Sequence, residues 1–182
     1  MSNIKLKQKI VAAFCGKDET RSTLLYAYMD EKHKALISTD GYRLAFMPSL
    51  YRENLAGKLI LSSTVATGDY ATPSDYMGAE FPNVSTIIDG LPKELNDSIY
   101  FPEWFSKLKT VKRESPIVKI GQSFINGELV QLFAGNNLFY ASKSEQTPIV
   151  FKFDQKDDDL IVIMPMRLTE ARSFIIVNKE EK

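Results

Sequence analysis

The segment of residues 38–47, STDGYRLAFM, constrains the fold more than any other part of the sequence. Asp40-Gly41 stands between two β-favouring arms, and this dipeptide supplies the positive φ angles that a tight hairpin turn requires. The pattern therefore predicts two antiparallel strands joined at this point. The tip is polar, with Leu44 and Phe46 beside it, a mixture suited to binding something amphipathic. A hairpin without a binding role is the alternative.

Length and composition favour one compact intracellular domain. A chain of 182 residues with 44% hydrophobic content can bury a core without disulfides or metal. Cys15 is the single cysteine, and its place at the end of an apolar helical run predicts a small buried side chain, with a reactive thiol as the alternative. The sequence contains neither an apolar run of membrane-spanning length nor a secretory signal. We therefore expect a cytoplasmic protein without membrane contact.

Hydrophobic periodicity predicts an α+β fold in which two short helices pack on antiparallel sheets. The first helix is expected over residues 4–14, with Ser2 or Asn3 as its N-cap, and the second over residues 102–113, with Trp104 in the core. Strands are expected over residues 24–29, 35–38, 42–47, 58–62, 117–120, 128–133, 138–142, 149–153, 160–164 and 172–177. Hairpin turns are expected at Asn126-Gly127 and at residues 135–137, and a long loop at residues 68–82.

The distribution of reactive side chains gives little support to catalysis. There is no glycine-rich phosphate loop and no metal-ligand spacing. His33, the only histidine, lies in a charged turn and is expected to be exposed, and the three carboxylates at 157–159 are expected to form a solvated turn and not a metal site. We therefore expect neither an enzyme nor a cofactor. With 23 basic and 23 acidic residues, any nucleic-acid contact must come from local patches.

Four short motifs, in order along the chain, resemble one family. TDGYRLA at residues 39–45 resembles the TDG-x-RLA segment of the bacterial β sliding clamp, the processivity subunit of DNA polymerase III. VIMPMRL at residues 162–168 resembles the segment with which that clamp's chain ends. RSTL at residues 21–24 is similar to the family's R-x-x-L, and FPN at residues 81–83 to its FP-[DN]-Y linker. Together the four motifs are far more specific than any one of them.

The resemblance implies a hydrophobic cleft that binds short peptides from DNA polymerase or other clamp-binding proteins. The TDGYRL and MPMRL segments would form its opposite walls, and Thr39, Arg43 and Arg167 would orient the polar ends of the peptide. The cleft residues implied are Leu24, Thr39, Gly41, Tyr42, Arg43, Leu44, Pro82, Ile87, Val162, Met164, Pro165, Met166, Arg167 and Leu168. For residues 164–168 the alternative is a core strand that ends at a proline.

The two expected helices have basic faces, which a clamp domain turns toward double-stranded DNA. Such lysines attract phosphates without reading bases, so the binding would be non-specific. The residues concerned are Lys5, Lys7, Lys9, Lys107, Lys109, Lys112 and Arg113. A solvated helix surface is the alternative for both faces.

The sequence also departs from the family. A clamp subunit has three domains of similar fold, so this chain is expected to be a single clamp-like domain over residues 1–182. Its first half, 1–90, would resemble the family's middle domain, its second half, 91–168, the last domain, and 169–182 would be an extension. Residues 84–86, VST, replace the family's aromatic and arginine residues. Two functions remain: a clamp that surrounds DNA as a homo-oligomer, or a non-ring adaptor or decoy that keeps the peptide cleft.

Overall fold

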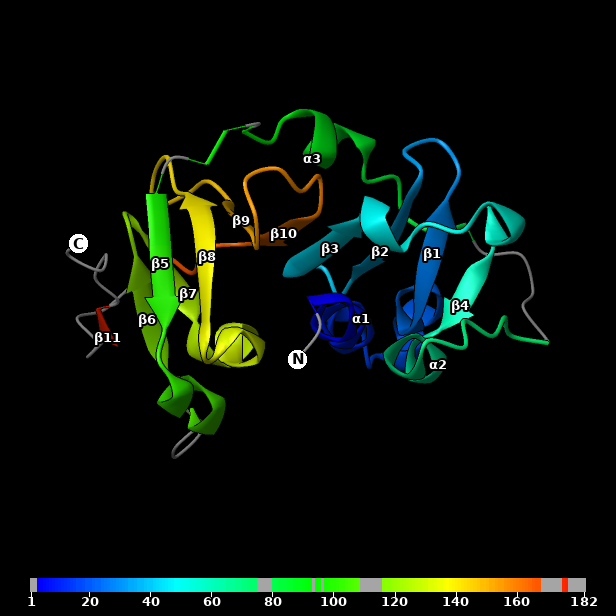
Figure 1. Ribbon diagram of the computed structural model, residues 1–182, viewed down its shortest axis with the longest axis horizontal. Helices are drawn as coiled ribbons and strands as arrows, with labels where there is room; N and C mark the ends of the chain where they lie inside the picture. The colour runs from blue at the N-terminus through cyan, green and yellow to red at the C-terminus, as the bar shows by residue number, and fades with distance from the viewer. Residues whose placement is uncertain are drawn as a thin grey trace. The chain divides into compact units, whose positions relative to one another are not determined.

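The structure is a computed structural model, and it describes residues 3–74, 80–92, 94–95, 97–108, 116–167 and 175–176. The chain divides into two compact units (Figure 1). The first comprises Met1–Leu91 with Asp158–Ile161, and the second comprises Pro92–Asp157 with Val162–Lys182. The fold is α+β, as the periodicity predicts. That the two halves make up one clamp-like domain stays a prediction.

The first unit consists of helices and a four-stranded antiparallel sheet in the order β4-β1-β2-β3. Its strands are β1 (Tyr26–Asp30), β2 (Ala35–Thr39), β3 (Arg43–Met47) and β4 (Leu59–Leu61). Its α-helices are α1 (Asn3–Phe14), α2 (Ser62–Thr67) and α3 (Ser85–Asp89). Three 3-10 helices complete it: η1 (Glu19–Leu25), η2 (Pro48–Leu50) and η3 (Glu53–Leu55).

Helix α1 packs on β2 and β3 through the apolar stripe that its sequence predicts. Ile10, Val11 and Phe14 are fully buried. Met47 lies on the sheet face that α1 covers, because Arg43, four residues earlier on β3, contacts the Phe14 ring. Burial of each such side chain stabilises the unit by roughly 1.5–3 kcal/mol.

The opposite face of this sheet is also covered. Tyr28 and Ile37 stand side by side in the β1–β2 register, and Phe46 follows Ile37 in the β2–β3 register. The ring of Phe81 stacks on Tyr28 with a centroid distance of 5.2 Å. Strand β2 is therefore buried along its whole length.

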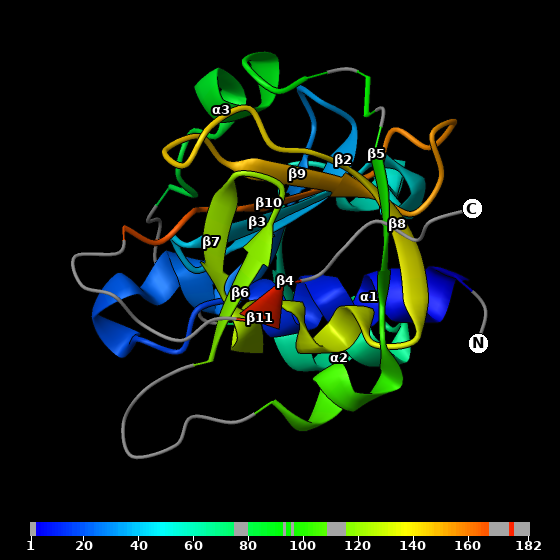
Figure 2. The same cartoon turned by 90° about the vertical axis from the view of Figure 1, so that its left-hand side faces the viewer.

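The second unit has two small sheets (Figures 1 and 2). In one, β9 (Ile149–Lys152), β8 (Asn136–Ala141) and β5 (Asp97–Phe101) are antiparallel neighbours. In the other, β6 (Ile117–Ile120) lies between antiparallel β7 (Ser123–Asn126) and parallel β11 (Ile175–Ile176). The 3-10 helices η4 (Glu103–Lys107) and η5 (Gly127–Phe133) belong to this unit, and β10 (Leu160–Ile163) begins in the first unit and ends in the second.

A cluster of phenylalanine rings forms the core of the second unit. Phe101 contacts Phe105, Phe133 and Phe151 at centroid distances of 5.6, 5.4 and 6.0 Å. All four side chains are fully buried, and their edge-to-face arrangement is the one that aromatic rings prefer.

Within the described residues, no helix is long and apolar enough to cross a bilayer.

Two predictions for the second unit are wrong. The predicted helix over residues 102–113 is a 3-10 helix over Glu103–Lys107, followed by extended backbone at Leu108, while residues 109–115 lie outside the described residues. Trp104 is 48% exposed, and its neighbour Phe105 takes the core position. A 3-10 helix has three residues per turn, fewer than an α-helix. It therefore turns a different side chain toward the core than the α-helical pattern predicts.

The strand and turn predicted at residues 126–133 are also wrong, because this segment forms η5. Asn126 caps η5 by accepting a hydrogen bond from the Glu128 backbone N–H at 2.9 Å. Gly127 lies so close to Val118 that a Cβ there would stand 3.0 Å from its Cγ2. The glycine therefore serves close packing and not a hairpin turn.

Two further corrections concern charged residues of the first unit. His33 was expected to be an exposed turn residue without an acidic partner, but its Nδ1 pairs closely with the Asp30 carboxylate. Asp159 was expected to be solvated, but only 2% of it is exposed. Its carboxylate accepts hydrogen bonds from the Ser49 backbone N–H and hydroxyl at 2.9 and 2.5 Å.

Candidate functional site

A cavity of about 410 Å³ lies beside the tip of the β2–β3 hairpin in the first unit. We call it the hairpin pocket. Its lining residues come from three segments: the connection after α1, the 3-10 helix η1 and the hairpin tip. They are Cys15, Gly16, Lys17, Asp18, Arg21, Leu24, Asp40, Tyr42 and Arg43. Two of the motifs found in the sequence therefore meet at one cavity.

The hairpin tip is a four-residue loop held by the Asp40 side chain. The last paired residues are Thr39 and Leu44. The Asp40 carboxylate accepts hydrogen bonds from the backbone N–H of Tyr42 and Arg43 at 2.9 and 3.1 Å, and from Arg43 Nε at 2.7 Å. Within this loop, Gly41 alone has a positive φ, +93°. The turn is therefore not the two-residue type that the Asp-Gly dipeptide predicts.

Arg43 is fixed at both ends of its guanidinium. Besides its ion pair with Asp40, its Nη2 donates to the Ala13 carbonyl oxygen at 2.7 Å. The guanidinium also lies 4.6 Å from the centroid of the Phe14 ring. Two of its five N–H donors are thus used within the protein, and Arg43 is held in the pocket wall by these bonds.

Leu24 is brought to the pocket by a tight connection after α1. The Gly16 backbone N–H donates to the Leu24 carbonyl oxygen at 2.6 Å, and a Cβ on Gly16 would stand 3.1 Å from Leu24 Cβ. Asp18 caps η1 by accepting hydrogen bonds from the Thr20 N–H and hydroxyl, which lower its pKa. The connection leaves Leu24 only 8% exposed, as an apolar part of the lining.

Cys15 is buried, which confirms the prediction. Its thiol is 4% exposed and donates to the Val11 carbonyl oxygen at 3.5 Å. Burial raises the pKa of Cys15 to about 12. The thiolate is therefore scarce at neutral pH, which argues against a reactive thiol.

Not every predicted cleft residue of the first unit lines the hairpin pocket. Thr39 is 8% exposed, and its hydroxyl donates to the Arg43 carbonyl oxygen at 2.7 Å and accepts from the Gly41 N–H at 3.1 Å. Thr39 therefore braces the hairpin, which is not the ligand-orienting role expected of it. Leu44 is 4% exposed and points to the sheet face opposite Arg43, so it is a core residue.

Pro82 and Ile87 belong to the segment that covers the other sheet face. Pro82 lines a separate, smaller cavity. Ile87, on α3, is 46% exposed. Neither residue lines the hairpin pocket.

The predicted second wall belongs to the second unit. Val162 is buried, Met164 is 42% exposed, and Pro165 and Met166 are half-buried. The Met166 N–H donates to the Phe124 carbonyl oxygen at 2.6 Å, so this segment runs beside β7. Arg167 is exposed, and Leu168 lies outside the described residues. That this segment faces the hairpin tip across a cleft stays a prediction.

The predicted DNA-facing residues divide into three groups. Lys5, Lys9 and Lys107 are exposed, as a phosphate-facing surface requires. Lys7 is not, because it is 4% exposed and its Nζ lies 2.5 Å from Asp159 Oδ2; the expectation for this residue was wrong. The remaining three, Lys109, Lys112 and Arg113, lie outside the described residues.

The sequence did not single out all residues of the pocket. Lys17 and Asp18 carry no functional signal in the sequence, Arg21 belongs to the RSTL motif without a predicted part in the cleft, and Asp40 belongs to the polar hairpin tip but not to the predicted cleft. The signal for Asp40 was present, since an aspartate at a turn caps the following N–H groups.

Among the described residues, no group of three or more His, Cys, Asp or Glu side chains is arranged to hold a metal.

Helix α1 packs on an antiparallel sheet, the TDG hairpin borders a pocket, and the fold is that of a DNA clamp. Comparison with solved structures identifies this fold more closely as that of the β sliding clamp of bacterial DNA polymerase III, which confirms the expectation from the motifs. No protein-family model and no curated protein sequence matches the chain.

The similar structures are distant in sequence. The clamp of Bartonella birtlesii bound to griselimycin superposes with a TM-score of 0.64 and 16% identity over 92% of this chain and 65% of its own. That of Borrelia burgdorferi, in complex with a natural product, gives 0.63 and 12% over 91% and 61%. That of C. crescentus gives 0.60 and 15% over 91% and 63%. The chain thus spans less than two thirds of the length of these clamps.

Proposed function

We propose that this chain is a sliding-clamp-like DNA replication protein, without enzymatic activity, that binds short peptides of clamp partners at the hairpin pocket. The observation that carries the proposal is the meeting of Leu24 and Tyr42, from two separate motifs, at one cavity in a chain with the clamp fold. Two of the similar clamps were solved with a bound compound, so the fold accommodates ligands.

The pocket suits one large apolar side chain flanked by charge. Leu24 offers buried apolar surface, and Tyr42, 68% exposed, places an aromatic ring at the rim. Burial of one leucine or phenylalanine of a peptide contributes roughly 1.5–3 kcal/mol before ordering costs. Lys17, Arg21 and Asp18 supply charges of both signs around the cavity for the polar parts of the peptide.

We propose the MPMR segment of the second unit as a further apolar contact for clamp-binding peptides. Met164 is exposed and Met166 half-exposed, and methionine adapts its shape to different partners. Micromolar binding corresponds to about 8 kcal/mol. Apolar anchors at roughly 1.5–3 kcal/mol each supply only part of this, so the charged groups around the hairpin pocket contribute as well.

Fluorescence polarisation with a labelled clamp-binding peptide tests the proposal. Tyr42→Ala should weaken binding about tenfold or more, since it removes an exposed ring that contributes to the pocket and nothing to the core. Ile4→Ala, which removes another exposed large apolar side chain (56%) outside the pocket, is the control and should bind normally. Absence of binding at high micromolar protein would remove the proposal.

One observation favours a second function, that of an adaptor or decoy that does not surround DNA. The burial of Lys7 removes one of the chain's expected phosphate contacts. Mass in solution separates the two functions: a stable oligomer retained on circular but not linear DNA supports the clamp, and a monomer that binds peptide supports the adaptor.

A further inference from the structure

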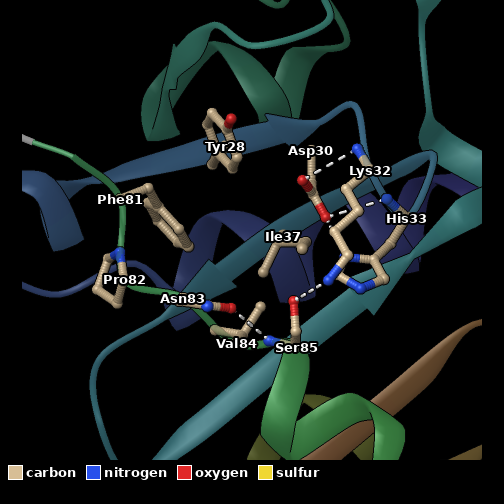
Figure 3. A pocket seen from close by; sticks show the side chains of 10 residues that line it. All are labelled: Tyr28, Asp30, Lys32, His33, Ile37, Phe81, Pro82, Asn83, Val84 and Ser85. Atoms are coloured by element: carbon tan, nitrogen blue, oxygen red, sulfur yellow. Dashed lines mark hydrogen bonds and ion pairs between the residues drawn. The ribbon is translucent and has the colours of Figure 1, made fainter.

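A second cavity, of about 210 Å³, lies on the sheet face of the first unit that α1 does not cover (Figure 3). We call it the Tyr28 pocket. It shares no lining residue with the hairpin pocket. Its lining comes from β1, the β1–β2 turn, β2 and the segment that leads into the first residue of α3.

One side of the Tyr28 pocket is apolar. The Tyr28 and Phe81 rings stack with an interplanar angle of 17°, and Ile37 and Val84 continue this surface (Figure 3). The cavity has the volume of roughly one large side chain, below the range of drug-sized ligand sites. It therefore suits a single apolar or aromatic group.

The carboxylate on the opposite side already has hydrogen-bond partners. The Asp30 carboxylate accepts hydrogen bonds from the backbone N–H of Lys32 and His33 at 3.3 and 3.2 Å, and it pairs closely with His33 Nδ1. Asp30 is 9% exposed. Its acceptor sites are thus used within the turn and are not offered to a cation.

Lys32 is the positive group that remains available in the pocket. Its Nζ donates to Ser85 Oγ at 2.9 Å (Figure 3), and within the described part of the chain no carboxylate forms an ion pair with it. The ammonium keeps two further N–H donors, and the Ser85 hydroxyl, which accepts from Lys32, keeps its own proton to donate. These groups can donate hydrogen bonds to the two oxygens of one carboxylate at the edge of the apolar surface.

We infer that the Tyr28 pocket binds a carboxylate attached to a small apolar or aromatic group. The carboxylate would accept from Lys32 and Ser85, and the attached group would lie on Ile37 and the stacked rings. A single ammonium matches a single negative charge, and the exposed Glu31 and Glu80, next to lining residues in sequence, disfavour a polyanion such as nucleic acid. The last residue of a partner polypeptide and a free small acid share this chemistry.

The test uses N-acetylphenylalanine and its amide, which differ only in the carboxylate. Methyl resonances of Ile37 and Val84 in the full chain should shift on addition of the acid, and the shifts should saturate. The amide should bind at least about tenfold more weakly, because it lacks the charge-assisted hydrogen bond. Equal binding of acid and amide, or no shift at these methyl groups, would overturn the inference. Preferential shifts with a single-stranded oligonucleotide would overturn it as well.

A pair of lysine variants assigns the effect to the pocket. Lys32→Met should weaken binding of the acid about tenfold. Lys34→Met should bind like the wild type, because Lys34 does not line the pocket and its Nζ bonds the Tyr51 hydroxyl at 3.2 Å. An unchanged spectrum of the free variants shows that both are folded, and unaltered binding by Lys32→Met would contradict the inference.

A third comparison identifies the source of the carboxylate. A peptide with a free C-terminal phenylalanine that binds more tightly than N-acetylphenylalanine supports a polypeptide end, and equal affinities support a free small acid. The inference does not rest on the proposed function. Tyr42→Ala should leave this binding unchanged, so failure at one pocket is separable from failure at the other.

Discussion

Lys7 Nζ lies 2.5 Å from Asp159 Oδ2, and the exposed fractions of the two side chains are 5% and 2%. This buried ion pair joins the first helix to a residue near the end of the described chain. Ser49 donates two hydrogen bonds to the same carboxylate, so the negative charge is further satisfied. Each of the two buried charges is balanced by the other. Removal of one partner would leave the other charged and without its counterion.

We expect Lys7→Met and Asp159→Asn each to lower the free energy of unfolding by about 3–5 kcal/mol. The double variant should lose less than the sum of the two, because it leaves no buried charge unpaired. Urea denaturation of all three measures this. Lys34→Met, which breaks the exposed pair with Glu53, is the control and should unfold like the wild type. Strict additivity of the two single variants would contradict the coupling.

Asp40 combines two roles that substitution can separate. Asp40→Asn keeps an oxygen acceptor for the N–H groups of Tyr42 and Arg43 but loses the ion pair with the Arg43 guanidinium, whereas Asp40→Ala loses both. We expect Asp40→Ala to lower the free energy of unfolding by about 1–3 kcal/mol and Asp40→Asn by a smaller amount. Thermal unfolding measures the difference, and equal losses would show that the backbone cap contributes nothing.

Cys15 predicts a pH dependence of stability. Burial raises its pKa from 9.0 to about 12. Between these pH values the unfolded thiol has lost its proton while the folded one keeps it, so the free energy of unfolding falls as pH rises, by up to roughly 1.4 kcal/mol per pH unit. Cys15→Ala should remove this component. The measurement is the difference in unfolding free energy between wild type and variant at a series of pH values, and a difference independent of pH would refute it.

Trp104 and Phe105 are adjacent in sequence but differ in burial, at 48% and 0% exposure. We expect Phe105→Ala to lower the free energy of unfolding by about 3–5 kcal/mol, because it empties a site in the phenylalanine cluster. Trp104→Ala should cost much less. Denaturation midpoints give the comparison, and iodide quenching of wild-type fluorescence should report an accessible indole.

Local patterns predicted the first helix and the four strands of the first unit, but not α2 or α3. The stripe of α1 and the apolar arms beside Asp40-Gly41 are short-range signals, and the helix and hairpin form where they indicate. The second unit was harder because its elements depend on tertiary contacts. Residues 128–133 have the β-favouring Val130 and Phe133, yet they form a 3-10 helix whose apolar side chains fill the core. Strand β5 had no alternation to reveal it.

The candidate site shows the same division. Leu24 and Tyr42 could be placed together from motifs, since each motif lies on a short segment with a local fold. Local patterns do not indicate that Thr39 is used inside the hairpin. Strand alternation does place Leu44 and Arg43 on opposite faces, and assigning both to one cleft did not allow for it. The pairing of Lys7 with Asp159 was equally hidden, because charge alone does not distinguish a solvated residue from a buried, compensated one.

The interrupted course of the chain through its two units limits how the protein can be dissected. A fragment that stops at Leu91 would contain Lys7 and Ser49 but no Asp159. The buried Lys7 ammonium would then lack its counterion. Grafting residues 158–161 onto such a fragment through a short linker would restore that carboxylate. Any attempt to study the amino-terminal half alone has to begin with those four residues.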